Sequence, residues 1–563
     1  MDKSTLSNYG WIVIVTLVLS VMLAFATPFG GFVARGVSNV IKYYKTATGD
    51  VFSAYFLKGK QGEWDDYLND VLQPDNDHIF AIGKTKPEYV LAVFNEDFTH
   101  VNIVKNGTNS DGLMKDFRTR DSFIKPDLTN DEIDVAWKPH ASPMQLNAKT
   151  LKSATVEKGV VSLGVYAFYK CDNLQNITFA KTVKKIDTHC FMYCKKLPSI
   201  IIPEKVKKIS NYCFYGCNKL IEIKIPETLT TIGSCAFFGC NALSNFDFPK
   251  ECKEIQTAAF GCANLKSVTL PKGFLKLGSH AFESNHELKT ISIPASTTVI
   301  EEAILKRTKS LKSIIIDSDN PNYTVIDGVL YNADKTLLLA CISNKEGTYS
   351  LLPTVEKIGD GAFSQSRLKT VFANDNLKEI HNDAFEYSQI ESFNIPLNVK
   401  TIGDTVFFEV KNLKTITVDS NNTNFKIIDD GLYSFDEKTF YCLPAANTQT
   451  TFTMLPSVTT IVPGAFACAT NLQEITIPEG VTTIPSYCFY QTTSKINLPT
   501  NFKAIGYGAF GHISNLTSIT IPESVKSINE DAFVNTPLTT IYGKSGSSAE
   551  TFANIKKITF VAI

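Results

Sequence analysis

An Ala-Phe or Cys-Phe pair recurs along most of this chain, and its spacing limits the possible folds more than any other feature. Within each of three groups, successive phenylalanines lie 21 to 23 residues apart. A fixed period of this length indicates a solenoid, in which each repeat forms one coil that stacks on its neighbours. The three groups are Phe168, Phe191, Phe214, Phe237, Phe260 and Phe282, then Phe363, Phe385 and Phe407, then Phe466, Phe489, Phe510 and Phe533.

The repeat that begins at residue 220 shows the physical basis of this prediction. Its segment 220–226 reads Leu-Ile-Glu-Ile-Lys-Ile-Pro. Ile223 and Ile225 are two residues apart and therefore point to one face of a short strand, whereas Lys224 points to the other face. Phe237 then fills the interior of the coil. Stacked coils share a parallel sheet with strands roughly 4.8 Å apart, and each buried Ile or Phe contributes about 1.5 to 3 kcal/mol.

Two longer stretches, near residues 317–350 and 419–452, separate the three groups and resemble each other. The first contains Ile-Asp-Gly-Val-Leu-Tyr from residue 326, and the second contains Ile-Asp-Asp-Gly-Leu-Tyr from residue 428. Each then passes through a polar turn into an apolar strand, at residues 337–341 and 439–443. This pattern predicts two β-hairpin insertions, each of which lengthens one coil.

The repeat region covers residues 151–540, and the segments on either side of it differ from the coils. The ends of a solenoid must differ in this way in order to cover the core. Residues 45–150 show no repeat. Apolar runs at residues 89–94 and 101–104 predict strands within a small mixed module that caps the first coil. Residues 541–563 predict a C-terminal cap with a turn, a short helix and a closing strand.

An apolar segment, Gly10 to Ala34, carries no charge and dominates residues 1–44. About 20 such residues span a bilayer as a helix. We favour a retained membrane anchor over a signal peptide cleaved after Ala26, although Ala24-Phe25-Ala26 has the form of a cleavage site.

The charges that follow this segment complicate its orientation. Arg35, Lys42 and Lys45 would keep the C-terminal side in the cytoplasm by the positive-inside rule. Long domains can cross a membrane despite a few positive charges. We therefore still expect the repeats to lie at the cell surface.

The composition excludes a nucleic-acid-binding protein and a disulfide-rich secreted scaffold. The 563 residues have a net charge of -1, and the 13 cysteines are an odd number in a long chain. Most cysteines recur at fixed repeat positions, which favours reduced thiols in the core. Disulfides between repeats and a metal-binding role for some cysteines remain alternatives.

Three sets of residues have spacings that resemble metal or catalytic sites. Cys190/Cys194 and Cys213/Cys217 have the spacing of metal ligands, but the repeat places all four inside the coil. The acidic and amide groups of the insertions could bind Ca²⁺, but turn formation explains them better. These groups are Asp317, Asp319, Asn322, Asp419, Asn421 and Asn424.

An enzyme site is the third possibility, and it would have to lie within residues 45–150. The titratable groups available there have no arrangement that suggests an acid–base pair. They are Asp65, Asp66, Asp75, Asp77 and His78. We therefore predict no enzyme, no cofactor, no metal site and no catalytic residue, and the ligand-binding residues stay unassigned.

The repeat unit Leu-x-x-Ile-x-Ile-Pro, followed by Ile-Gly and Ala-Phe-x-x-Cys, resembles the BspA-type leucine-rich repeats of bacterial and protist surface proteins. The resemblance covers about residues 150–563, including both insertions. It implies a surface-exposed repeat protein that takes part in adhesion and has no shared catalytic residues. The chain departs from the pattern at Ile304, which stands in place of the expected Phe, and near Ser494, where the leading Leu is missing.

The outward positions of the strands are the predicted binding surface, and examples are Glu222, Lys224, Ser292, Thr476 and Thr520. We expect a protein or glycan partner on a host, a neighbouring cell or a matrix, and no nucleic acid. The chain would be held at the cell surface by residues 10–34, or secreted if it is cleaved. The alternative is a structural envelope spacer that assembles through its N-terminal helix.

Overall fold

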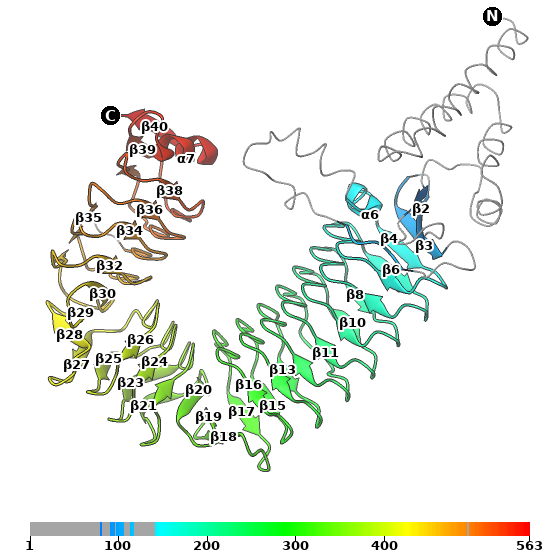
Figure 1. Ribbon diagram of the computed structural model, residues 1–563, viewed down its shortest axis with the longest axis horizontal. Helices are drawn as coiled ribbons and strands as arrows, with labels where there is room; N and C mark the ends of the chain where they lie inside the picture. The colour runs from blue at the N-terminus through cyan, green and yellow to red at the C-terminus, as the bar shows by residue number, and fades with distance from the viewer. Residues whose placement is uncertain (1–78, 82–89, 96, 106–112, 118–140, 493–494) are drawn as a thin grey trace, which may run out of the picture. The chain divides into compact units, whose positions relative to one another are not determined.

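A computed structural model describes residues 79–81, 90–95, 97–105, 113–117, 141–492 and 495–563. The chain divides into two compact units, the first ending at Leu243 and the second beginning at Ser244. Figure 1 shows that the repeats of each unit are coils of short strands. Each coil contributes one strand to a first row and a shorter strand to a second row. We call the segment from the second strand to the next coil the arc.

The first unit contains four such coils, whose strands pair in parallel. Glu222–Lys224 pairs with Ser199–Ile201, and Thr231–Ile232 pairs with Lys208–Ile209. The first row is β4 (Ser153–Val156), β6 (Asn176–Phe179), β8 (Ser199–Ile201) and β10 (Glu222–Lys224). The second row is β5 (Ser162–Leu163), β7 (Lys185–Ile186), β9 (Lys208–Ile209) and β11 (Thr231–Ile232).

The second unit continues the same design with two longer coils. Its first row is β13 (Ser267–Thr269), β15 (Thr290–Ile293), β17 (Ser313–Ile316), β21 (Glu346–Ser350), β23 (Arg367–Phe372), β25 (Ser392–Ile395), β27 (Thr415–Val418), β31 (Thr451–Thr453), β33 (Glu474–Thr476), β35 (Lys495–Asn497), β37 (Ser518–Thr520) and β39 (Thr540–Gly543). Its second row is β12 (Glu254–Ile255), β14 (Lys276–Leu277), β16 (Val299–Ile300), β20 (Leu337–Cys341), β22 (Lys357–Ile358), β24 (Glu379–Ile380), β26 (Thr401–Ile402), β30 (Thr439–Cys442), β32 (Thr460–Ile461), β34 (Thr483–Ile484), β36 (Ala504–Ile505) and β38 (Ser527–Ile528).

The recurring phenylalanines form the stacked core that their spacing predicts. In the first unit, the ring centroids of Phe191 and Phe214 are 5.5 Å apart, and those of Phe214 and Phe237 are 5.4 Å apart. All three side chains are fully buried. The arcs are also joined through the backbone, because the amide of Phe191 donates to the carbonyl of Cys213 at 2.9 Å. The predicted inward placement is confirmed.

The cysteines are core thiols, as the repeat pattern predicts. All 13 are free, and all are buried except Cys235 and Cys262, which are partly exposed. The thiol of Cys217 donates to the carbonyl of Phe191 in the preceding coil, with an Sγ–O distance of 3.1 Å. Burial raises the pKa of Cys217 to about 12, so this thiol stays protonated at neutral pH.

Both predicted hairpin insertions are present in the second unit. The first pairs β18 (Tyr323–Ile326) with β19 (Val329–Asn332), and the second pairs β28 (Phe425–Ile428) with β29 (Gly431–Ser434). The third strand of each insertion, β20 or β30, then joins the second row in parallel. The first row is interrupted at the same places, because β17 and β27 are the last strands of their sheets.

The structure corrects the expectation for Ile304. Phe260 donates its amide hydrogen to Ala281, and Phe282 donates to Ile304 in the equivalent bond. Ile304 therefore occupies the position of the alanine that precedes each core phenylalanine. The neighbouring Leu305, which is 5% exposed, takes the phenylalanine position. The step from Phe282 to Leu305 is 23 residues, as in the earlier coils, whereas the step from Phe260 to Phe282 is 22. Ser494, the other predicted irregularity, lies outside the described residues.

The described parts of the ends agree with the expected strands. In the N-terminal region, β1 (Ile79–Ala81), β2 (Val90–Phe94) and β3 (His100–Lys105) are antiparallel, and β3 pairs in parallel with β4. Ser142 caps the short helix α6 (Pro143–Leu146).

At the C-terminus, α7 (Ser548–Lys556) lies between β39 and β40 (Thr559–Ala562), which pair in parallel. Within the described ranges, no helix is long and apolar enough to cross a bilayer. The apolar segment at residues 10–34 lies outside those ranges.

Candidate functional site

The first insertion brings together two arcs that are far apart in sequence. Only residues 342–345 connect β20 to β21, so the hairpin coil has a short link in place of an arc. As a result, the arc before the insertion lies next to the arc after it. The amide of Arg307 donates to the hydroxyl of Ser364 across this junction, at 3.3 Å.

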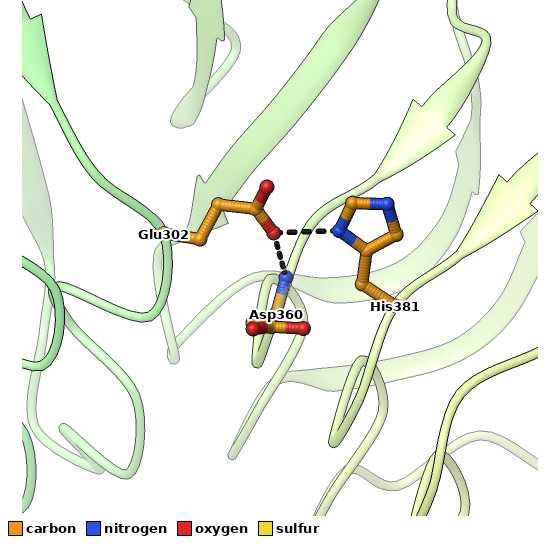
Figure 2. Close-up of side chains that lie close together, drawn as sticks. All are labelled: Glu302, Asp360 and His381. Atoms are coloured by element: carbon orange, nitrogen blue, oxygen red, sulfur yellow. Dashed lines mark hydrogen bonds and ion pairs between the residues drawn. The ribbon is translucent and has the colours of Figure 1, made fainter.

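Three titratable side chains converge at this junction, each from a different arc (Figure 2). Glu302 Oε2 lies 2.7 Å from Nδ1 of His381 and accepts a hydrogen bond of 2.7 Å from the backbone amide of Asp360. The other ring nitrogen of His381 lies 3.1 Å from a carboxylate oxygen of Glu379. Both nitrogens of the imidazole therefore face carboxylates.

This geometry favours the charged form of the imidazole. The hydrogen bond to Glu302 raises the pKa of His381 to about 9, with support from Glu379 and against the effect of partial burial. Burial works to raise the pKa of Glu302, but its bonds to His381 and to the Asp360 amide lower it overall. Burial and the charge of Glu302 raise the pKa of Asp360. At neutral pH the pair is an imidazolium with a carboxylate.

A second charged group crosses the same junction and is more deeply buried. Lys306 Nζ lies 2.6 Å from Asp383, and the guanidinium of Arg307 contacts Glu386, with Nε 3.0 Å from that carboxylate. The side chain of Glu386 is 1% exposed and that of Lys306 is 8% exposed. The guanidinium also lies over the ring of Tyr387, 5.5 Å from its centroid. We call these pairs the first strap. The strap joins the arc of Lys306 and Arg307 to the arc of Asp383 and Glu386, across the arc that lies between the two.

Small residues in the intervening arc make room for the first strap. A Cβ atom at Gly361 would lie 2.9 Å from Cγ of Lys306, and one at Gly359 would lie 3.1 Å from a carboxylate oxygen of Glu302. Both contacts are tighter than ordinary van der Waals distances. Because the intervening arc is thin at these glycines, the side chains of Glu302 and Lys306 can reach across it. Their partners, His381 and Asp383, are more than 70 residues away in the sequence.

The second insertion has an equivalent strap of different chemistry. The ring of Phe408 packs against Tyr487 and Tyr490, with centroids 5.0 and 5.5 Å apart. The carboxylate of Glu409 accepts a hydrogen bond of 2.9 Å from the side-chain amide of Gln491. Again a glycine makes room, since a Cβ atom at Gly464 would lie 3.0 Å from the Phe408 ring. The second strap is mainly aromatic.

The group in Figure 2 is also where a metal ion could be held among the described residues. Glu302, Asp360 and His381 offer ligand atoms that all lie within 4.8 Å of one another. However, a metal ion needs a neutral imidazole nitrogen, and both nitrogens of His381 are engaged by carboxylates. The arrangement therefore works best as an ion-pair clamp between arcs. The sequence analysis missed it because its members are 58 and 79 residues apart.

The structure gives the predicted acidic and amide groups turn contacts and coil-to-coil contacts. Asp317 accepts a hydrogen bond from the amide of Asp319, and Asp419 accepts one from the amide of Asn421, at 3.1 and 2.9 Å. Asn322 instead donates to a carbonyl of the preceding coil, at 3.2 Å. These contacts support the turn interpretation. The acidic residues proposed as alternatives within residues 65–78 lie outside the described ranges.

The outward positions of the first row form an exposed ladder that is mostly polar, as predicted, although Ile201, Ile315 and Phe372 are apolar members of it. Glu222, Lys224 and Thr520 are exposed, whereas Ser292 and Thr476 are half-buried. Charged side chains of neighbouring coils form ion pairs along this ladder. Lys414 Nζ, for example, lies 2.7 Å from Glu391 in the coil before it.

Comparisons with known proteins identify the repeats but not a partner. The family model described as "BspA type Leucine rich repeat region (6 copies)" matches residues 146–261, 207–332, 346–435 and 433–560. No match was found among curated protein sequences.

Among solved structures, the chain is similar to a leucine-rich repeat protein from Eubacterium ventriosum, with 20% identity, 82% of this chain and 96% of that one covered, and a TM-score of 0.39. It is also similar to a leucine-rich cell surface protein from Faecalibacterium prausnitzii, with 18% identity, coverage of 87% and 96%, and a TM-score of 0.34. For the pneumococcal vaccine antigen PcpA, the values are 15% identity, coverage of 86% and 99%, and a TM-score of 0.30. Similarity at this level concerns the repeat alone. The family match extends over most of the sequence, and this chain belongs to the BspA-type leucine-rich repeat family.

Proposed function

We propose that this chain is a cell-surface recognition protein without catalytic activity. It would bind a protein or glycan on a host, a neighbouring cell or a matrix through the exposed ladder of its first-row strands. Membership of the BspA-type family supports this proposal. In repeat proteins, an extended surface of this kind is the usual place for a partner.

The observation that carries the proposal is the separation of core and ladder within each strand. In β8, Ile200 is 3% exposed, whereas Ile201 beside it is 64% exposed. In β10, Glu222 and Lys224 are exposed and pair only loosely, at 3.8 Å. Exposed pairs contribute about 0 to 1 kcal/mol to stability. Ladder residues can therefore vary to suit a partner without affecting the fold.

The proposed location depends on the apolar segment at residues 10–34. If it is retained as an anchor, the repeats are displayed on the cell. If it is cleaved after Ala26, they are secreted. In either case the ladder would be outside the cell, where the proposed partners are.

The test measures two properties, the exposure of the repeats on intact cells and the adhesion of those cells. Intact cells that express the full chain are treated with a protease that cannot enter them, and the loss of repeat fragments is followed with an antibody against the C-terminus. The same cells are then applied to immobilised matrix proteins and to host-cell monolayers, with untransfected cells as the control. We expect protease-sensitive repeats and increased adhesion. Repeats that stay protected, or adhesion equal to the control, would contradict the proposal.

A further inference from the structure

A cleft opens where the second insertion interrupts the first row of strands. Its volume is about 410 Å³, within the range of roughly 300 to 1,000 Å³ typical of small-ligand sites. One wall is the strand β27, and the other is the hairpin that begins with β28. Both strands are the last of their sheets. The floor is apolar, since Ile416 is 4% exposed and Phe425 is 3% exposed.

An aromatic ring stands at the mouth of this cleft. Phe435 lines the cleft and is 51% exposed, so a ligand in the cleft can reach its ring. Lys426 holds the ring in place, with Nζ 5.0 Å from the ring centroid, and is itself held by Glu437 at 2.7 Å. The ring is therefore both fixed and accessible.

Two carboxylates line the same cleft and are fixed by neighbouring groups. Asp430 accepts hydrogen bonds on Oδ2 from the side-chain amides of Asn447 and Gln449, at 3.0 and 3.1 Å. Asp419 accepts a hydrogen bond on Oδ1 from the amide of Asn421, at 2.9 Å. In each carboxylate, these hydrogen bonds fall on one of the two oxygens. Carboxylates held in this way are preorganised to accept hydrogen bonds from hydroxyl groups.

The first insertion provides an internal comparison. Its strands have the same register, because Tyr323 pairs with Asn332 where Phe425 pairs with Ser434. The positions equivalent to Phe435, Lys426 and Asp430 are Ala333, Thr324 and Gly328. The ring, the cation that holds it and one carboxylate are thus confined to the second insertion. The shared hairpin fold does not require any of them.

We propose that this cleft binds a neutral sugar unit of a glycan. The inference rests on the proposed function and narrows it to one site and one class of ligand. A pyranose has an apolar C–H face, which suits the electron-rich face of Phe435, and hydroxyl groups around its rim, which suit Asp419 and Asp430. The two carboxylates disfavour sialylated or sulfated sugars, because the only lysine lining the cleft is already paired with Glu437.

The test uses the full-length chain on an array of defined neutral and sialylated oligosaccharides, followed by calorimetric titration with the neutral oligosaccharide that gives the strongest signal. We expect binding of neutral glycans. Phe435→Ala and Asp430→Asn should each weaken it by roughly tenfold or more, a difference of about 1.4 kcal/mol. Tyr507→Ala is the matched control, because Tyr507 is an aromatic residue that is 41% exposed but lies on an arc and does not line the cleft. Its affinity should equal that of the unaltered chain.

Several results would overturn the inference. They are a silent array, binding of anionic glycans only, and equal affinity for the unaltered chain and Phe435→Ala. Capture of an extended peptide in place of a sugar, as the open edges of β27 and β28 would permit, is a fourth. An adhesion assay distinguishes failure of the glycan site from failure of the proposed recognition function. If cells carrying Phe435→Ala adhere like the unaltered cells and the array is silent, only the glycan site is wrong.

Discussion

The rings of Phe191, Phe214 and Phe237 show how one residue type sets the period of the stack. Each ring lies almost parallel to the next, with interplanar angles of 3° and 5°. The ring of Phe214 therefore packs against one ring on each side. The packing of the core therefore depends on each ring individually.

We expect Phe214→Ala to lower the free energy of unfolding by about 3 to 5 kcal/mol, because it removes a fully buried ring and leaves a cavity between two others. A denaturant titration followed by circular dichroism measures the change. Glu222→Ala, on the exposed ladder, should change it by less than about 0.5 kcal/mol. Similar values for the two variants would show that Phe214 is not interior.

His381 makes stability depend on pH in a defined window. Its pKa is about 9 in the folded chain, above the reference value of 6.5, so folding favours the protonated form. The resulting stabilisation is complete below pH 6.5 and is lost as the pH rises through 9. We expect a loss of about 1 to 2 kcal/mol over this window, allowing for solvent screening of a partly exposed side chain.

Thermal unfolding measured between pH 6 and 10 checks this expectation. His381→Gln keeps a hydrogen-bond donor for Glu302 but cannot gain a proton, so its stability should fall less over the same window. His286→Gln, at an exposed position, is the control and should follow the unaltered chain. A His381→Gln curve with an undiminished slope would show that other groups cause the dependence.

At the scale of elements, the two straps compensate for the interruptions that the hairpins introduce. Each insertion interrupts both rows. The first-row sheets end at β17 and β27, the second-row sheets end at β16 and β26, and β20 and β30 pair with the second row only on their far side, with β22 and β32. The straps join the arc before each insertion to an arc after it, and so restore contact between coils on that side of the stack. One uses buried ion pairs and the other uses aromatic rings, so the geometry recurs even though the chemistry differs.

We expect Glu386→Ala to destabilise the chain by about 3 to 5 kcal/mol, because it removes the buried carboxylate that Arg307 contacts most closely, whereas Lys306 keeps Asp383. Glu391→Ala is the matched control, since Glu391 also contacts two cations, Lys369 and Lys414, but on the exposed ladder. It should cost less than about 1 kcal/mol. Chemical denaturation of both variants provides the comparison, and equal losses would rule out a special role for the first strap.

The sequence predicts the coils and hairpins well because their signals are local. The spacing of Phe363 and Phe385, or the similar runs that begin at Ile326 and Ile428, can be read within a short window. The straps cannot be read in this way. The contact between Arg307 and Glu386 spans 79 residues and arises only because a shortened link removes one arc.

Two details of the structure show the same limit of local patterns. A step of 22 residues, as between Phe260 and Phe282, assigns the phenylalanine position to Ile304, whereas the 23-residue step of the earlier coils leads to Leu305. The cleft at the second insertion also escaped notice. Its signal, Phe435 opposite Ala333, becomes visible only once the strand register of the two hairpins is known.

For the whole molecule, the ends of the stack limit its solubility and stability, since an open coil exposes its core. At the C-terminus, α7 covers the last coil. Ala549 and Ala553 are fully buried, and Phe552 packs against Phe533 with ring centroids 5.7 Å apart. On the other side of the same helix, Ile555 is 70% exposed. One helix thus offers an apolar side chain in the cap interface and another outside it.

These two positions test whether the helix acts as a cap. Phe552→Asp would place a charge without a partner against the last coil, so we expect a lower midpoint of thermal unfolding, increased binding of a hydrophobic dye and self-association. Ile555→Asp adds the same charge to the same helix but should leave all three measurements unchanged. Because a repeat stack is held by contacts between neighbours, the damage from Phe552→Asp should begin at the C-terminal coils and spread inward. Hydrogen exchange would show it first in β38 and β39. Exchange that rises uniformly along the chain, or equally in both variants, would mean that the repeats end without a cap.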